Sequence, residues 1–114
     1  MKRDITLYLT DILEAIALIE NSTQNISWKT FEKNKDIQDA TIRRIEIIGE
    51  AVKNVPEYFR KKYPAIEWKK IAGSRNVLAH AYFGVNIGKI WEVVQSDLPK
   101  LKKEIKNILK LEAK

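Results

Sequence analysis

Apolar residues in the first part of the chain recur at steps of three and four, the period of an amphipathic α-helix. Charged residues such as Lys2, Asp11 and Glu14 lie off this stripe. The turn-forming run over residues 21–25, Asn-Ser-Thr-Gln-Asn, predicts the end of the helix. The predicted stripe consists of Ile5, Tyr8, Leu9, Ile12, Leu13, Ile16 and Ile19.

Two helical segments are predicted in the next part of the chain. A short one over residues 26–31 adds one or two turns, and a longer helix begins near Asp36. Gly49 lies inside the longer helix, where glycine costs about 1 kcal/mol relative to alanine. This glycine therefore predicts a close approach between helices. The predicted buried face of the longer helix is Ile42, Ile45, Ile48, Ala51 and Val52.

Prolines and glycines divide the chain that follows. Pro56 ends the longer helix and suits the first position of a short helix over residues 56–62, which Pro64 closes. A further helix is predicted over residues 66–83, with Gly84 as its C-terminal cap. The run Asn-Ile-Gly at residues 86–88 then starts the last segment.

The last segment carries seven apolar positions in one helical phase, which predicts a long helix with a narrow apolar seam. Pro99 lies inside it and must kink or split it, because the proline ring clashes with the preceding turn. Strand-like alternation is absent from the sequence, so we expect an all-α fold: an antiparallel bundle of four to five helices in a single domain, residues 1–114. The seam is Ile87, Trp91, Val94, Leu98, Leu101, Ile105 and Ile108.

Composition narrows the class of protein. With 114 residues, 45% of them apolar, the chain can bury a real but small core, which favours self-association. It has no cysteine, which excludes disulfides and thiolate metal sites and fits a cytoplasmic setting. The N-terminal stretch is amphipathic rather than continuously apolar, so neither a signal peptide nor a membrane span is expected.

The net charge of +6 and the pI of about 9.5 favour polyanionic partners. Two stretches carry most of this charge. In residues 98–114 the lysines are best interpreted as a solvated helix face. The stretch over residues 58–75 leads directly into the candidate site described next, and for it both nucleic-acid contact and simple solvation remain open. Its cations are Arg60, Lys61, Lys62, Lys69, Lys70 and Arg75.

The candidate chemistry is concentrated in residues 75–83, Arg-Asn-Val-Leu-Ala-His-Ala-Tyr-Phe. Arg75 can hold a phosphate, and His80, the only histidine, can transfer a proton. On an ideal helix His80 lies about 140° round from Arg75 and shares a face with Asn76. The two side chains would therefore converge only if the helix ends near His80, or if two copies of the chain share one cleft.

Each of these residues also has a simpler interpretation. His80 could cap a helix end or fill a half-buried position, and Arg75 could form an ion pair with Glu67 or Glu50. Tyr82 and its neighbour Phe83 could belong to the core. Metal binding is disfavoured, because one histidine and no cysteine leave only carboxylates as ligands. Glu46 and Glu50 share a helix face, but Arg43 lies three residues before Glu46 and predicts a surface ion pair instead.

The order Arg75, four residues, His80, Ala81, Tyr82 resembles the Arg-x4-His-x-Tyr signature of the HepT-like proteins in the HEPN superfamily. The resemblance extends over nearly the whole chain. Its further landmarks are Ile47 to Ala51, Tyr63 to Trp68, Ile71 to Asn76, Phe83 to Val85, Ile90 to Glu92 and Asp97 to Pro99.

This resemblance implies a homodimeric, HEPN-like toxin that cleaves RNA without a metal or other cofactor. It implies as partner a minimal nucleotidyltransferase that acts as the antitoxin. By the same resemblance Arg75 would bind the scissile phosphate, and His80 would act as general base or acid in attack by the 2′-hydroxyl, at a dimer cleft. Tyr82 matches the tyrosine that the partner adenylylates to silence the toxin.

Supporting contacts are expected from three residues near the motif: Asn76 would orient His80 or bind phosphate, and Lys69 and Lys70 would bind phosphate. One position departs from the family pattern. Relatives often carry an acidic or polar residue between histidine and tyrosine, where this chain has Ala81. If an acid there polarises the histidine, that help is absent here, which predicts a weaker site at most.

Two other functions stay open from the sequence. One is a non-catalytic subunit that docks a nucleotidyltransferase and presents a nucleotide or substrate to it. The other is a structural bundle whose last helix mediates assembly, in which Arg75 and His80 would tolerate substitution. A nucleotidyltransferase gene next to this one would favour the toxin or the docking subunit over the structural bundle.

Overall fold

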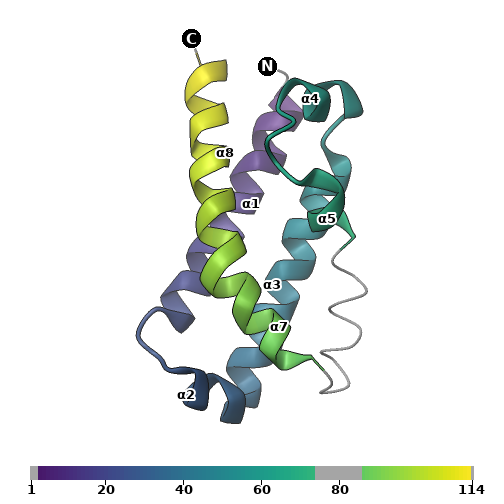
Figure 1. The fold of residues 1–114 in the computed structure, drawn as a ribbon. Coiled ribbons are helices and arrows are strands. Elements are labelled where there is room, and N and C mark those ends of the chain that lie inside the picture. Colours follow the sequence, from purple (N-terminus) through teal and green to yellow (C-terminus); the bar gives the residue numbers. More distant parts are fainter. Residues whose placement is uncertain (1–2, 74–85, 114) are drawn as a thin grey trace.

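The computed structural model describes residues 3–73 and 86–113, which form an all-α fold (Figure 1). Two long helices, α1 (Arg3–Thr23) and α3 (Lys35–Asn54), run antiparallel and pack against each other. A third long helical segment, called the last rod, consists of α7 (Ile87–Glu92), a π-helical turn (Val93–Asp97) and α8 (Leu98–Glu112). This rod also runs antiparallel to α1, and α8 packs on α1 (Figure 1).

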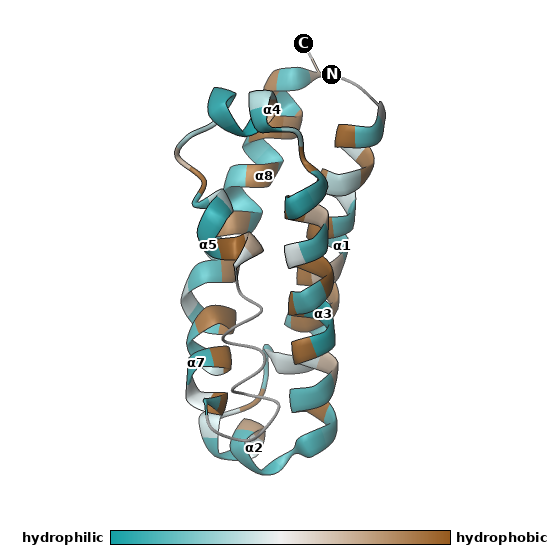
Figure 2. Ribbon diagram, turned by 90° about the vertical axis from the view of Figure 1, so that its right-hand side faces the viewer, coloured by the Kyte–Doolittle hydropathy of each residue, from teal (hydrophilic) through white to brown (hydrophobic). Residues whose placement is uncertain are grey.

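The core lies where these helices face one another, and apolar residues gather on the facing sides (Figure 2). The predicted stripes of all three segments are confirmed. On α1 only Tyr8 and Leu13 are partly exposed, and on the last segment only Ile87 and Trp91. The predicted face of α3 is completely buried, and Gly49 is buried beside it.

The predicted end of α1 within residues 21–25 is confirmed, and the helix continues into this run as far as Thr23. Two hydroxyl groups explain the extension. Ser22 Oγ donates to the carbonyls of Leu18 and Ile19 at 3.2 and 3.1 Å, and Thr23 Oγ1 donates to Ile19 O at 2.7 Å. Side chains that favour turns in isolation bond back to the helix here and are compatible with it.

The short helix α2 (Trp28–Lys33) begins two residues later than predicted, and α3 begins one residue earlier. Ser27 caps α2, since its side chain accepts from Thr30 N at 3.2 Å. Asn34 ends α2 and caps α3, accepting from Ile37 N at 3.0 Å. Gln38 then ties the two helices together, because its Nε2 donates to Phe31 O and Glu32 O.

Helix α4 (Glu57–Lys62) follows Pro56, which stands just before the helix rather than at its first position. Helix α5 (Trp68–Ala72) begins two residues after the predicted start, and Gly73 caps its C-terminal end, so the predicted helix is interrupted at Gly73. The rest of the predicted helix, residues 74–83, lies outside the described residues. The Gly73 N–H donates to Lys69 O at 2.8 Å, and a Cβ at Gly73 would lie 3.0 Å from the same oxygen. This close backbone approach explains why glycine suits the end of α5. The predicted Gly84 cap lies outside the described residues.

Pro99 changes the helix type without stopping the last rod. Its ring would meet the carbonyl of Gln95, and it has no N–H to donate. The five residues before Leu98 adopt a π-helical turn, in which Leu98 N donates to Val93 O, five residues earlier. This wider turn accommodates Pro99 in the first turn of α8. The sequence predicted a kink or a split at Pro99, and the structure shows a π-helical turn instead of a split, because the helical segment is continuous over residues 87–112.

A polar clasp joins α4 to the last turn of α8 at the end of the molecule where both chain termini lie (Figure 1). Lys62 Nζ donates to Glu112 Oε2 at 2.7 Å, and Tyr63 Oη donates to the same oxygen. These hydrogen bonds, first from Lys62 and then from Tyr63, hold the pKa of Glu112 below its ordinary value. The clasp fixes the segment that leads from α4 into α5.

No described helix is both long and apolar enough to cross a membrane.

Candidate active site

The motif residues Arg75, Asn76, His80 and Tyr82 lie outside the described residues, so their roles stay predictions. The structure does describe the two attachment points of their segment. Gly73 ends α5, and Asn86 precedes α7. Helices α5 and α7 both pack against α3, so the described residues on either side of the motif segment lie beside the same long helix.

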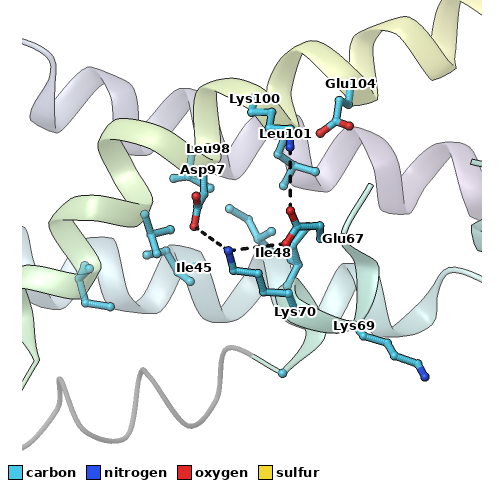
Figure 3. Close-up of a pocket in the computed structure, with 14 residues that line it drawn as sticks. Ile45, Ile48, Glu67, Lys69, Lys70, Asp97, Leu98, Lys100, Leu101 and Glu104 are labelled. Carbon is cyan, nitrogen blue, oxygen red and sulfur yellow. Dashed lines mark ion pairs between the residues drawn. The ribbon is translucent and has the colours of Figure 1, made fainter. Parts of the chain in front are cut away.

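A cavity of about 520 Å³ lies between α3, α5 and the last rod, and Gly73 is part of its lining (Figure 3). Its floor is apolar. The only polar groups among its described lining residues are charged side chains, which come from α5, the residue before it and the last rod. The apolar floor consists of Ile45, Ile48, Ile71, Ile90, Val93, Leu98 and Leu101.

Three ion pairs lie at the rim of this cavity, and two of them, Lys70–Asp97 and Lys100–Glu67, cross from the α5 region to the last rod (Figure 3). Lys70 Nζ lies 3.6 Å from Glu67 and 3.9 Å from Asp97, and Lys100 Nζ lies 3.9 Å from Glu67. Exposed pairs at these distances stabilise little. They do, however, join α5 to the last rod and place two carboxylates beside the charge of Lys70.

The two lysines predicted to bind phosphate have different surroundings. Lys70 is shared between Glu67 and Asp97, whereas the Lys69 side chain points away from the rim (Figure 3). Lys69 is exposed and forms no ion pair with any described residue. Of the two, Lys69 is therefore the cation better placed to meet an external anion, and phosphate binding by either stays a prediction.

No pattern in the sequence indicates that Asp97 and Lys100 are partners of the α5 region. They lie about 30 residues from Glu67 in the chain, and only the packing of the last rod brings them together. The predicted surface ion pair on α3 is confirmed, with Arg43 3.7 Å from Glu46. Among the described residues, no group of three or more histidine, cysteine, aspartate or glutamate side chains could hold a metal ion.

The fold and the cavity define a small all-helical protein with a charged cavity beside the end of α5. A family model described as "Ribonuclease HepT-like" matches residues 12–108, a range that includes Arg75, His80 and Tyr82. The chain therefore belongs to the HepT-like ribonuclease family, as its sequence motif predicted.

Several curated proteins are similar over nearly the whole chain. "Gamma-glutamylcyclotransferase and putative RNase MJ0434" of Methanocaldococcus jannaschii is 52% identical over 96% of this chain, which spans 49% of that protein. "Putative RNase MJ1216" of the same organism is 46% identical over 96% of this chain and 90% of its own length. "Probable ribonuclease HepT" of Thermococcus cleftensis is 46% identical over 96% of this chain and all of its own. No solved structure matches the chain.

Proposed function

We propose that this protein is an endoribonuclease that cleaves RNA without a metal ion, as the toxin of a cytoplasmic toxin–antitoxin pair. The observation that carries the proposal is the family match over residues 12–108, which spans the whole Arg-x4-His-x-Tyr motif. Relatives named as ribonucleases support it, because two of them align over 90% or more of their own lengths. A pI of about 9.5 suits a polyanionic substrate.

In the proposed mechanism, Arg75 binds the scissile phosphate and stabilises the charge that develops on its oxygens. His80 takes the proton of the 2′-hydroxyl, whose oxygen attacks phosphorus while the bond from phosphorus to the 5′-oxygen breaks. The products are a 2′,3′-cyclic phosphate and a 5′-hydroxyl, so no water is consumed in this step. Asn76, four residues before His80, orients the ring or binds the phosphate.

We place this chemistry in the cleft of a homodimer. On one straight helix Arg75 and His80 point about 140° apart, so a second copy supplies the missing group more readily than one helix can. A second His80 in the same cleft can also return a proton to the leaving 5′-oxygen. A homodimer is thus part of the catalytic proposal rather than an independent one.

The test of the proposed activity is RNA cleavage in the presence of a chelator. We expect the purified protein to convert single-stranded RNA into fragments with 2′,3′-cyclic phosphate and 5′-hydroxyl ends, identified by end-specific labelling and mass spectrometry. Cleavage that stops with chelator and returns with a divalent ion would contradict the mechanism. A folded dimer that cuts no RNA would favour a non-catalytic subunit of a nucleotidyltransferase.

Regulation of this site is proposed to act through Tyr82, which lies two residues after His80. A nucleotide transferred to its hydroxyl by a minimal nucleotidyltransferase would add charge and bulk beside the catalytic histidine. We expect incubation with that enzyme and ATP to add one adenylyl group at Tyr82, detected by mass spectrometry, and to stop cleavage. The Tyr82→Phe variant should keep its activity under the same treatment. Silencing of that variant as well would show that Tyr82 is not the modified residue.

A further inference from the structure

A second groove, of about 480 Å³, lies between α4 and α5 on the side of α5 that carries Lys69. Its apolar lining is formed by Pro64, Ile66 and Trp68. Ile66 and Trp68 are buried, and Trp68 Nε1 donates to Tyr63 O at 2.9 Å, so the indole is held in place. The polar clasp of Glu112 fixes the preceding turn, which gives the groove a firm floor.

Charged side chains surround this floor, and cations outnumber carboxylates by four to two. Two of the cations have partners on exposed surface: Lys61 lies 3.6 Å from Glu57, and Lys70 lies 3.6 Å from Glu67. Such exposed pairs are weak and exchange readily for another anion. The remaining two cations, Arg60 and Lys69, form no ion pair with any described residue. The groove therefore carries two uncompensated positive charges.

Arg60 is the most unusual of these side chains. It is half-buried, and its Nε is inaccessible to solvent, yet the described part of the chain offers that nitrogen no hydrogen-bond acceptor. Buried donors in folded proteins almost always have an acceptor. A guanidinium also presents several N–H groups in a fixed plane that matches the oxygens of a phosphate. Because the Nε is enclosed, a phosphate in the groove would be bound by the terminal guanidinium nitrogens of Arg60.

The groove adjoins the cavity beside the end of α5, because the two share lining residues. Lys69 and Lys70 line both this groove and the cavity whose lining includes Gly73, and Arg75 follows Gly73 by two residues. We propose that the groove binds the sugar–phosphate backbone of the RNA substrate beside the cleaved bond, with Arg60 and Lys69 contacting phosphate oxygens. This inference rests on the proposed function and adds a substrate-binding surface to it.

The test is RNA binding by chains that carry His80→Ala, so that the probe is not cut. We would titrate a labelled single-stranded RNA at several salt concentrations, with Arg60→Gln, Lys69→Gln or both. Each lost phosphate contact should reduce the slope of log affinity against log salt by about 0.7, and the double substitution by about 1.4. Arg60→Lys, which keeps the charge, should retain most of the slope, and thermal melting verifies that each variant is folded.

Matched controls are Lys103→Gln and Lys106→Gln on α8, which remove the same charge from exposed lysines that form no ion pair with described residues. If the control variants lose as much of the salt slope, the effect comes from net charge alone, and the proposal that the groove binds RNA is wrong. An unchanged salt slope in the chain that carries both Arg60→Gln and Lys69→Gln would also contradict the proposal. So would a double variant that binds RNA normally but no longer binds the nucleotidyltransferase.

The failure of the proposed activity has a separate signature. If the chain with His80 intact cuts no RNA, but RNA binding still depends on Arg60 and Lys69, RNA binding by the groove is supported and the ribonuclease proposal is wrong. If that chain cuts RNA and the double substitution changes neither its cleavage nor the salt slope, the ribonuclease proposal is supported and RNA binding by the groove is wrong. If the His80→Ala chain binds no RNA at any salt concentration, the groove is also wrong.

Discussion

The His80→Ala variant is expected to lose RNA cleavage by about two to four orders of magnitude, the usual contribution of a positioned acid–base group. His80 is the only imidazole in the chain, so no other histidine can replace it. Histidine is the side chain whose charge changes near neutral pH, so it suits a step in which a proton is taken and later returned. The measurement is the single-turnover rate on a defined RNA at saturating protein, which separates chemistry from binding.

Two comparisons make this result specific. The variant should keep its far-UV circular dichroism, its melting temperature and its oligomeric state, because a catalytic defect leaves the fold intact. Arg75→Lys, which keeps the charge but loses the planar guanidinium, should fall between wild type and His80→Ala. A His80→Ala rate within about threefold of wild type would remove this residue from the mechanism, since acid–base catalysis contributes far more than that.

The three main apolar surfaces could be predicted from the sequence because a helix that buries one side must repeat its apolar residues every three or four positions. Ile12, Ile48 and Leu101 each lie in such a run, and all are buried in the structure. The runs are long enough that single exceptions, such as the half-exposed Tyr8, do not obscure the period. The all-α class of the fold follows from the same periodicity, because the sequence lacks the apolar–polar alternation that is typical of strands.

Helix ends were predicted less well, because they depend on hydrogen bonds of individual side chains. The turn-forming run over residues 21–25 located the end of α1 only to within a few residues, and the Thr23 hydroxyl, which donates to the Ile19 carbonyl, belongs to the last helical residue. Gly73 reads as an ordinary helical position between Ala72 and Ser74, yet α5 ends there. Both ends are set by hydrogen bonds to a carbonyl four residues earlier, Ile19 for Thr23 and Lys69 for Gly73, and apolar periodicity carries no information about such bonds.

The motif itself was found in the sequence, because Arg75, His80 and Tyr82 lie within eight residues. The surfaces around it could not be found that way. The rim of the cavity depends on Asp97 reaching Lys70, and the groove depends on α4 packing beside α5. In the sequence Arg60 is only one of six cations in a basic stretch, whereas in the structure it lines the same groove as Lys69. Contacts between distant residues carry no periodic signal in the chain.

One of these distant contacts holds the position where the motif segment rejoins the fold. Phe31 on α2 is completely buried, and its ring lies 4.9 Å from that of Trp91 on α7 and 6.4 Å from that of Trp28. Its carbonyl also accepts from Gln38 Nε2 at 2.8 Å, which ties α2 to α3. Phe31 is therefore the point at which α2, α3 and α7 are joined.

The Phe31→Ala variant is expected to lose about 3–5 kcal/mol of unfolding free energy, because truncating a buried phenylalanine removes apolar burial and leaves a cavity. For a domain of this size that is a large part of a total of about 5–15 kcal/mol. Urea unfolding followed by tryptophan fluorescence measures the loss, since Trp28 and Trp91 flank the site.

Phe31→Leu should lose less because it keeps most of the volume, and Trp28→Ala should lose less because that indole is already 36% exposed. A loss below about 1 kcal/mol in Phe31→Ala would mean that the neighbouring rings close over the gap, and that α7 is held mainly by its contacts with α3.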